Sequence, residues 1–135
     1  MTFADTNVLI DVATNNSEWA DWSRRALSSA HARGPLLINV VVYAEFAISF
    51  ASSMECDAEL QPFDLTIAEI PREAAFRAAQ AFHDYRRAGG ARTAVPPDFF
   101  IGAHASALKL PLLTRDVRRY RAYFPEVTLL APEGS

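Results

Sequence analysis

Ala4-Asp5-Thr6-Asn7-Val8-Leu9-Ile10-Asp11, almost at the start of the chain, is the most informative segment for the fold. The apolar residues before Asp5 suit a short buried strand, and a helix is expected to begin near Val8. Thr6 and Asn7 are residue types that cap helix N-termini. Asp5 would then lie at the carboxyl end of a strand, the edge at which open α/β sheets bind ligands. Taken alone, Asp5 is better explained as part of the helix cap.

Composition favours one compact domain spanning residues 1–135. Apolar residues make up 50% of the chain and charged residues 21%, which is ordinary for a globular protein. No apolar run is long enough to cross a membrane, and no signal peptide opens the chain. The single Cys56 excludes an internal disulfide and a cysteine-based zinc site. These features together predict a cytoplasmic protein.

The charge is unevenly distributed. The net charge of −3 argues against a nucleic-acid-binding protein, since such proteins usually carry a basic surface. However, residues 1–65 hold 3 Arg and 9 acids, whereas residues 66–135 hold 9 Arg, 1 Lys and 7 acids. Arginine binds phosphate through two hydrogen bonds. The distribution therefore permits an acidic site beside a basic rim.

Short apolar runs alternate with helical patterns along the chain. Strands are expected at residues 1–4, 36–38, 63–67, 111–113 and 127–130, and helices at 8–14, 17–32, 40–52, 71–88, from 96 onward and after Asp116. A short helix or turn is expected at residues 56–61. Parallel strands need helical crossovers, so the order predicts an α/β fold with a small, mainly parallel central sheet flanked by helices. Right-handed crossovers then bring all carboxyl strand ends to one edge.

Glu45 is the only charged residue between Gly34 and Met54. On a helical wheel it shares a stripe with Val41 and Ile48, which predicts that it faces inward. A buried carboxylate is costly unless it is paired, protonated or bound to a metal. A partner arginine explains Glu45 as well as a functional role does.

Two further acids occupy similar settings. Asp98 is the only charged residue between Arg92 and Lys109 and begins a helix, where an acid also favours the helix dipole. Asp116 follows Leu113-Thr114-Arg115, which repeats the opening order of strand, hydroxyl, carboxylate and helix. His104 lies off the inward stripe and is assigned to the structure, and Asp11 is assigned to the surface of the first helix.

Four carboxylates are thus expected to meet at one cleft: Asp5, Glu45, Asp98 and Asp116. They could not all remain ionised without compensation, because like charges raise one another's pKa. A divalent cation resolves this conflict. Oxygen ligands without Cys or a well-placed His suit Mg²⁺ or Mn²⁺. Such ions activate water and stabilise the oxygens of a phosphodiester, so the expected reaction is phosphodiester hydrolysis.

In its order of motifs, the chain resembles a PIN-domain ribonuclease. The motifs that carry the resemblance are Asp5 to Asp11, Glu45 in an apolar helix, Pro97 to Ala103 and Leu113 to Asp116. In size and order it is most similar to the toxin of VapBC-type toxin-antitoxin pairs. The resemblance covers nearly the whole chain, with residues 56–90 matching in pattern only. It implies a PIN-like α/β/α sandwich and a Mg²⁺- or Mn²⁺-dependent endoribonuclease. It also implies a homodimer, inhibited by a small antitoxin whose tail enters the acidic cleft.

The resemblance also assigns roles to residues. The four carboxylates match the acidic quartet of the family, with Asp5, Asp98 and Asp116 on the metal and Glu45 completing the site and orienting the attacking water. Thr114 matches an accompanying hydroxyl and Asn7 a polar neighbour of the first Asp. Asn39 stands where the family often has Ser or Thr, a capping substitute that should preserve activity. Candidate contacts to RNA phosphates are Arg115, Arg118, Arg119, Arg86, Arg87 and Arg92.

Two other interpretations remain. One is a catalytically inactive PIN-like module whose acidic cleft binds a basic partner peptide without metal. The other is a phosphatase with Asp5 as nucleophile, similar to haloacid-dehalogenase enzymes. Those enzymes usually carry a second Asp two residues later, where this chain has Asn7, and they use a Lys, whereas the only Lys here is Lys109. The phosphatase interpretation therefore ranks below the other two.

Overall fold

The computed structural model describes all 135 residues. The strands are β1 (Thr2–Ala4), β2 (Leu36–Asn39), β3 (Leu65–Ala68), β4 (Leu112–Leu113) and β5 (Leu129–Leu130). The helices are α1 (Thr6–Ala13), α2 (Ala20–Arg33), α3 (Val40–Ala47), α4 (Ser53–Leu60), α5 (Arg72–Arg87), α6 (Pro97–Leu108) and α7 (Arg118–Tyr123), with a short 3₁₀ turn, η1 (Gln61–Phe63), before β3.

The five strands form one sheet in the order β3-β2-β1-β4-β5, and every neighbouring pair is parallel. The first strand of the chain therefore lies in the centre of the sheet, between β2 and β4. Parallel pairing brings all five carboxyl strand ends to one edge, as the sequence predicts. Residues that follow β1 and β4 are neighbours at this edge.

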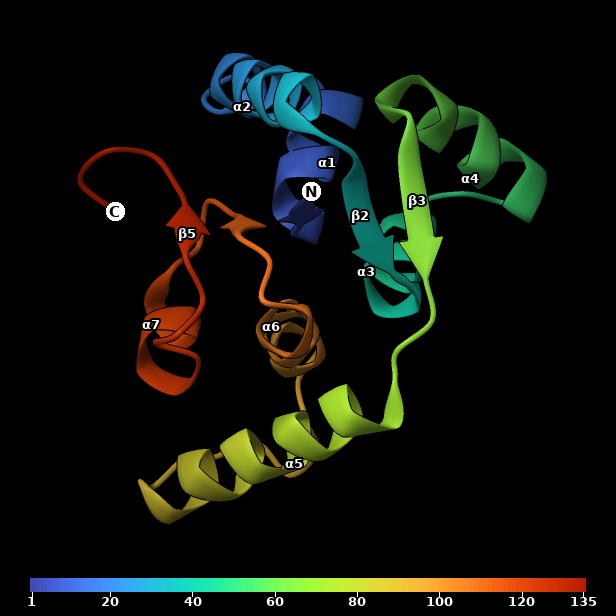
Figure 1. The fold of residues 1–135 in the computed structure, drawn as a ribbon. Coiled ribbons are helices and arrows are strands. Elements are labelled where there is room, and N and C mark those ends of the chain that lie inside the picture. The colour runs from blue at the N-terminus through green and yellow to red at the C-terminus, as the bar shows by residue number, and fades with distance from the viewer.

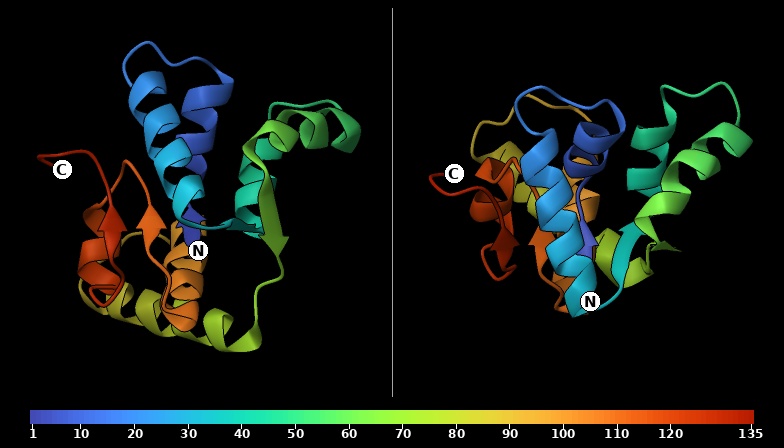
Figure 2. Two further views of the ribbon diagram at one scale, coloured as in Figure 1. Left: turned by 45° about the horizontal axis from the view of Figure 1, so that its top comes forward. Right: turned by 90° about the horizontal axis from the view of Figure 1, so that it is seen from above.

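Helices cover both faces of the sheet. Figure 1 shows α1 and α2 on one side, with α5, α6 and α7 on the other, and the left view of Figure 2 shows the same separation. The predicted α/β/α sandwich with a parallel central sheet is confirmed. No helix of the protein has the length and apolar character that a membrane crossing requires.

The core forms where the central strands meet these helices. Every residue of β1, β2 and β4 is buried, as expected for parallel strands covered on both faces. Phe3, Ile38 and Leu112 are 0% exposed and Leu36 and Leu113 1%. These short strands are continuously apolar except for Thr2 and Asn39, so periodicity alone could not assign them to one face.

Among the boundaries that differ from the sequence-based expectations, those of the first three helices differ for identifiable reasons. Helix α1 begins at Thr6 rather than near Val8, because Asp5 itself is the N-cap and accepts a hydrogen bond from the Thr6 amide. Helix α2 begins at Ala20, after a turn in which Asn16 accepts from the amides of residues 18 and 19. Helix α3 ends at Ala47, and a separate helix, α4, follows. The prediction that Thr6 and Asn7 cap the first helix was therefore wrong.

Candidate functional site

Asp5 lies directly after β1, in the centre of the sheet, and is 6% exposed. Its Oδ1 accepts from the Thr6 amide at 2.7 Å. Its Oδ2 accepts from the hydroxyls of Thr114 and Tyr120, each at 2.8 Å, and from the Asn7 amide at 3.3 Å. The carboxylate is thus fixed by residues from the start of α1, from the end of β4 and from α7. It is both a helix cap and a member of the acidic cluster, so the two interpretations of Asp5 do not exclude each other.

The surroundings of Asp5 disfavour the ionised form of its carboxyl group. Burial raises the pKa of Asp5 from 3.8 to about 6, against the lowering effect of the hydrogen bonds from Thr114, Tyr120 and Thr6. The nearby Glu45 carboxylate raises this pKa further. A positive ion in the cleft would favour the ionised form.

Glu45 projects from α3, but not from the face that the helical wheel predicts. The buried residues of α3 are Val42 and Phe46, whereas Ile48, expected on the inward stripe with Glu45, is 81% exposed. Glu45 is half-buried, and its Oε1 accepts from the Thr6 hydroxyl at 2.6 Å. Helix α3 is apolar almost all round, so its sequence could not identify the buried face. The bond to Thr6, rather than an ion pair with arginine, holds Glu45.

Asp98 occupies the first turn of α6, one residue after a proline at the first helical position. Arg119 Nη1 donates to its two carboxylate oxygens at 3.2 and 3.5 Å. Burial raises the pKa of Asp98, Arg119 lowers it, and Asp116 raises it. Asp98 and Asp116 are therefore close enough to repel each other, and one guanidinium partly compensates for that repulsion.

Asp116 is the most exposed of the four acids and lies in the loop between β4 and α7. Its backbone amide donates to the Thr114 hydroxyl at 3.1 Å. The Asn7 side chain accepts from the amide of Arg115 at 3.2 Å and so links α1 to the same loop. Thr114 and Asn7, both predicted to support the site, thus connect Asp5 to the segment that carries Asp116.

One cavity of about 680 Å³ brings the four acids together. It opens at the carboxyl edge of the sheet and is bordered by residues of α1, α3, α6, α7 and the loops before α6 and α7. Its charged lining consists of Asp5, Glu45, Asp98, Asp116, Arg92, Arg118 and Arg119. The structure therefore gathers the four carboxylates that the sequence singles out.

The six arginines predicted to bind RNA are placed differently from one another. Arg92, Arg118 and Arg119 line the cavity, but Arg86, Arg87 and Arg115 do not. Arg87 is exposed at the end of α5, and Arg86, beside it, donates to the backbone carbonyl of Arg92.

Arg115 forms an ion pair that the sequence did not reveal. Its Nε and Nη2 donate to the two oxygens of Asp11 at 2.6 and 2.8 Å, and the guanidinium lies 5.4 Å from the Trp19 ring centre. Asp11 is 1% exposed and also accepts from the Ser23 hydroxyl at 2.7 Å. The prediction that Asp11 is a surface acid was therefore wrong, because a partner 104 residues away in the sequence compensates for its buried charge.

Two residues that contact the acids are not among the site residues predicted from the sequence. Tyr120 lines the cavity and donates to Asp5, and Thr6 donates to Glu45. No sequence signal marks Tyr120, because Asp116 lies in the loop before α7 and the hydrogen bond from Tyr120 to Asp5 joins residues 115 positions apart. His104 is 1% exposed, so the expectation that it lies off the inward face of its helix was wrong. Its Nδ1 pairs with Asn39 Nδ2 at 3.2 Å, which fits a structural role.

The donor set of the cavity fits a hard divalent cation. Its potential ligands are carboxylate oxygens, with neither Cys nor His in the lining, and such ligands suit Mg²⁺ or Mn²⁺. No three of these side chains lie close enough together to hold one ion in this conformation. The acids line one cavity without converging on a point, and Arg119 pairs with Asp98.

Several solved structures are similar to this chain. The VapBC2 complex from Rickettsia felis, bound to a promoter DNA fragment, has a TM-score of 0.75 at 18% identity, with 98% of each chain covered. FitAcB from Neisseria gonorrhoeae has a TM-score of 0.70 at 20% identity over 100% of both chains. A toxin-antitoxin complex from Klebsiella pneumoniae has a TM-score of 0.68 at 23% identity, covering 95% of this chain and 96% of that chain.

These similarities concern the fold, because all three identities are below 25%. A search of curated protein sequences finds no significant match. The sequence profile of the PIN domain, by contrast, matches residues 2–125, from β1 to just beyond α7. That range includes the central sheet edge and all four acids of the cavity. The chain belongs to the PIN-domain family.

Proposed function

We propose that this protein is a metal-dependent endoribonuclease that hydrolyses RNA phosphodiester bonds in the cytoplasm, as the toxin of a toxin-antitoxin pair. One observation carries the proposal: four carboxylates from separate segments of the chain line one cavity whose other charged residues are all arginines. The carboxylates of such a lining can bind a cation, and its arginines can bind a phosphate group next to that cation. Membership of the PIN family supports nuclease chemistry, since the PIN-domain toxins of VapBC-type toxin-antitoxin systems are generally nucleases.

A divalent cation, Mg²⁺ or Mn²⁺, is part of the proposal. PIN domains typically use divalent metal ions. Asp5, Asp98 and Asp116 would hold the ion, with Glu45 completing the site. When bound, it would lower the pKa of a water molecule and stabilise the negative charge that develops on the phosphate. The raised pKa values of Asp5 and Asp98 support a site that gains from a positive charge.

The chain's own residues would orient the reactants. The Thr6 hydroxyl fixes Glu45, which places an acceptor at the cavity wall to orient the attacking water. Arg92 and Arg118 are exposed residues of the lining and would bind RNA phosphates on either side of the scissile bond. Arg119, which donates to Asp98 and lines the cavity beside it, would contact the phosphate nearest the reaction.

The remaining predicted arginines have different roles in this proposal. Arg86 and Arg87, at the end of α5, would extend the phosphate contacts beyond the cavity. Arg115 is assigned to the structure, because its guanidinium already binds Asp11 through two hydrogen bonds.

Cleavage of a structured RNA tests the proposal. Wild type is compared with Asp98→Asn and with the matched control Asp64→Asn. Asp64 is exposed, lies outside the cavity and has a positive φ of 50°, a conformation that Asn tolerates well. Wild type and control should cleave with Mg²⁺ or Mn²⁺, and Asp98→Asn should be slower by roughly 100-fold or more. Equal cleavage by all three proteins, or cleavage in excess EDTA, would contradict the metal-dependent mechanism.

The proposed partner is a small antitoxin with a basic, partly apolar segment. The similar solved structures include VapBC, FitAB and toxin-antitoxin complexes. In this chain, Ile10 and Ile48 line the acidic cavity and are 38% and 81% exposed, so the cleft offers both charge and apolar contact. We expect a short neighbouring gene that encodes a DNA-binding protein. The product of that gene should copurify with this chain and block RNA cleavage. Copurification without any nuclease activity would instead support the inactive peptide-binding module.

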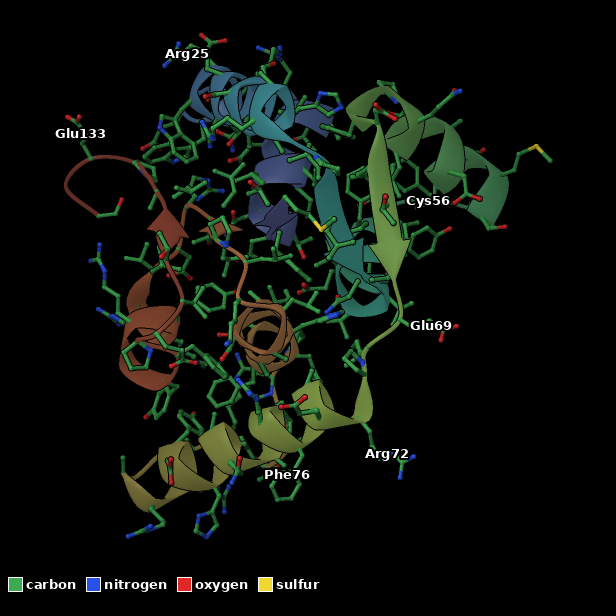
Figure 3. All side chains as sticks on the ribbon, viewed as in Figure 1. Arg25, Cys56, Glu69, Arg72, Phe76 and Glu133 are labelled. Carbon is green, nitrogen blue, oxygen red and sulfur yellow. The ribbon has the colours of Figure 1, made fainter.

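We also propose a homodimer. Figure 3 shows Phe76 directed away from the body of the protein on α5, and its side chain is 65% exposed. Large exposed aromatic side chains are enriched at protein interfaces. Light scattering should give twice the 14.9 kDa chain mass, and Phe76→Glu should lower it. A monomeric wild type at tens of micromolar would contradict the dimer.

A further inference from the structure

The buried Tyr120 hydroxyl connects α7 to the central strand of the sheet. It donates to Asp5 Oδ2 at 2.8 Å across 115 residues of sequence, and Tyr120 is 2% exposed. Helix α7 also carries Arg118 and Arg119 to the cavity. One hydrogen bond thus ties the helix that supplies two cavity arginines to the acid at the centre of the sheet edge.

The two oxygens of Asp5 have unequal numbers of hydrogen-bond partners. Oδ2 accepts from three donors, namely the hydroxyls of Thr114 and Tyr120 and the amide of Asn7. Oδ1 accepts only from the backbone amide of Thr6. A carboxylate oxygen offers about two lone pairs. Oδ2 is therefore saturated from inside the protein, whereas Oδ1 keeps one acceptor position.

The hydroxyl of Tyr120 is not explained by packing. Tyr123, three residues later on the same helix, contacts Phe99 and Tyr85 through its ring, at centroid distances of 5.5 and 6.0 Å, and its hydroxyl makes no hydrogen bond within the chain. A buried hydroxyl costs free energy unless it is hydrogen-bonded. A residue at position 120 that served only to pack the core would therefore be more favourable as phenylalanine. The oxygen at position 120 acts on Asp5.

We propose that Tyr120 is a positioning residue that fixes the Asp5 carboxylate, holding Oδ2 toward the protein and leaving Oδ1 as the single oxygen available to a divalent cation. The inference rests on the proposed function for its cation. The orientation of the carboxylate, however, can be observed without one. Ligands that hold a metal commonly depend on such hydrogen bonds, whose loss weakens binding by roughly 10- to 100-fold.

The test compares Tyr120→Phe with the matched control Tyr123→Phe, both of which keep the aromatic ring. Calorimetric titration with MnCl₂ should give a Kd about tenfold weaker for Tyr120→Phe and a Kd equal to wild type for Tyr123→Phe. With RNA, kcat of Tyr120→Phe should fall while KM is unchanged. A purely structural tyrosine would change thermal stability and leave the Mn²⁺ affinity at the wild-type value, and that result would overturn the proposal.

Crystal structures of metal-free wild type and Tyr120→Phe separate this inference from the proposed function. If wild type takes up no Mn²⁺, the metal-dependent function is contradicted, and the crystals alone decide the role of Tyr120. A rotated or doubly occupied Asp5 carboxylate in Tyr120→Phe would support positioning. An unchanged carboxylate, still accepting from Thr114 and Asn7, would overturn it.

Discussion

Arg115 and Asp11 form a two-point ion pair, with N···O distances of 2.6 and 2.8 Å, that joins α1 to the loop carrying Asp116. Asp11 is almost fully buried, with 1% of its side chain exposed, whereas 28% of the Arg115 side chain is exposed. Arg115 lies two residues after the end of β4, and Asp11 lies on α1, the helix that follows β1. The pair therefore fixes the loop next to the acidic cavity without taking part in the cavity lining.

Removing Arg115 should lower the free energy of unfolding more than neutralising Asp11. Arg115→Met leaves a buried carboxylate with only Ser23 as a side-chain partner, so it should lower the free energy of unfolding by about 3 to 5 kcal/mol. Asp11→Asn leaves a guanidinium that can regain water, and should cost only about 1 to 3 kcal/mol. Urea unfolding of the two variants and wild type measures both values. The reverse order of stabilities would show that the burial of Asp11 does not determine the cost.

Arg119 should compete with a cation for Asp98. Its guanidinium donates to both oxygens of Asp98 and lies 5.3 Å from the Tyr85 ring centre. Arg119→Met should therefore bind Mn²⁺ more tightly, by roughly two- to fivefold, because the partly exposed ion pair is worth less than about 1 kcal/mol. Cleavage of RNA should nevertheless weaken through a higher KM, since a phosphate contact is lost.

Arg121 provides the control for this experiment. It lies on the same helix but outside the cavity lining, where it donates to the backbone carbonyl of Ser135. Arg121→Met should change neither the Mn²⁺ affinity nor the KM. A weaker Mn²⁺ affinity for Arg119→Met than for Arg121→Met would refute competition at Asp98.

His104 should make the protein sensitive to mild acid. Burial lowers its pKa from the ordinary value of 6.5, so the folded state binds a proton less readily than the unfolded state. Its contribution to stability is complete above pH 6.5 and is lost as the pH falls below that value toward the lowered folded pKa. Relative to His104→Gln, wild type should lose stability between pH 7.5 and 5 in EDTA. The free energy of unfolding of His83→Gln, at an exposed position, should depend on pH as that of wild type does. A difference in the free energy of unfolding between wild type and His104→Gln that does not change with pH would contradict the role of His104.

The sequence could predict the sheet edge and its acids for a simple physical reason. Short apolar runs followed by capping or acidic residues recur at β1 and β4, and parallel pairing places their carboxyl ends together. Asp5 and Asp116 therefore follow neighbouring strand ends and line the same cavity. The isolation of Glu45 and Asp98 in apolar segments located the other two.

Tertiary contacts determined what the sequence could not. The ion pair of Asp11 with Arg115 and the bond of Tyr120 to Asp5 each join residues more than 100 positions apart. Helix α3 has apolar residues on every side, so periodicity did not identify its buried face, and Ile48 lies exposed beside the cavity. The capping of α1 by Asp5 depends on the exact residue at which the helix begins, which residue preferences leave open.

Anomalous diffraction from crystals soaked in MnCl₂, with data recorded at the manganese absorption edge, tests directly whether the acidic cavity binds a divalent cation. The carboxylates of the cavity should hold a divalent cation, so we predict a peak within about 2.5 Å of an oxygen of Asp5. The peak should also lie beside Asp98 or Asp116, with Arg119 displaced from Asp98. A map without any peak in this cavity, at Mn²⁺ concentrations that support RNA cleavage, would contradict the proposed cation site.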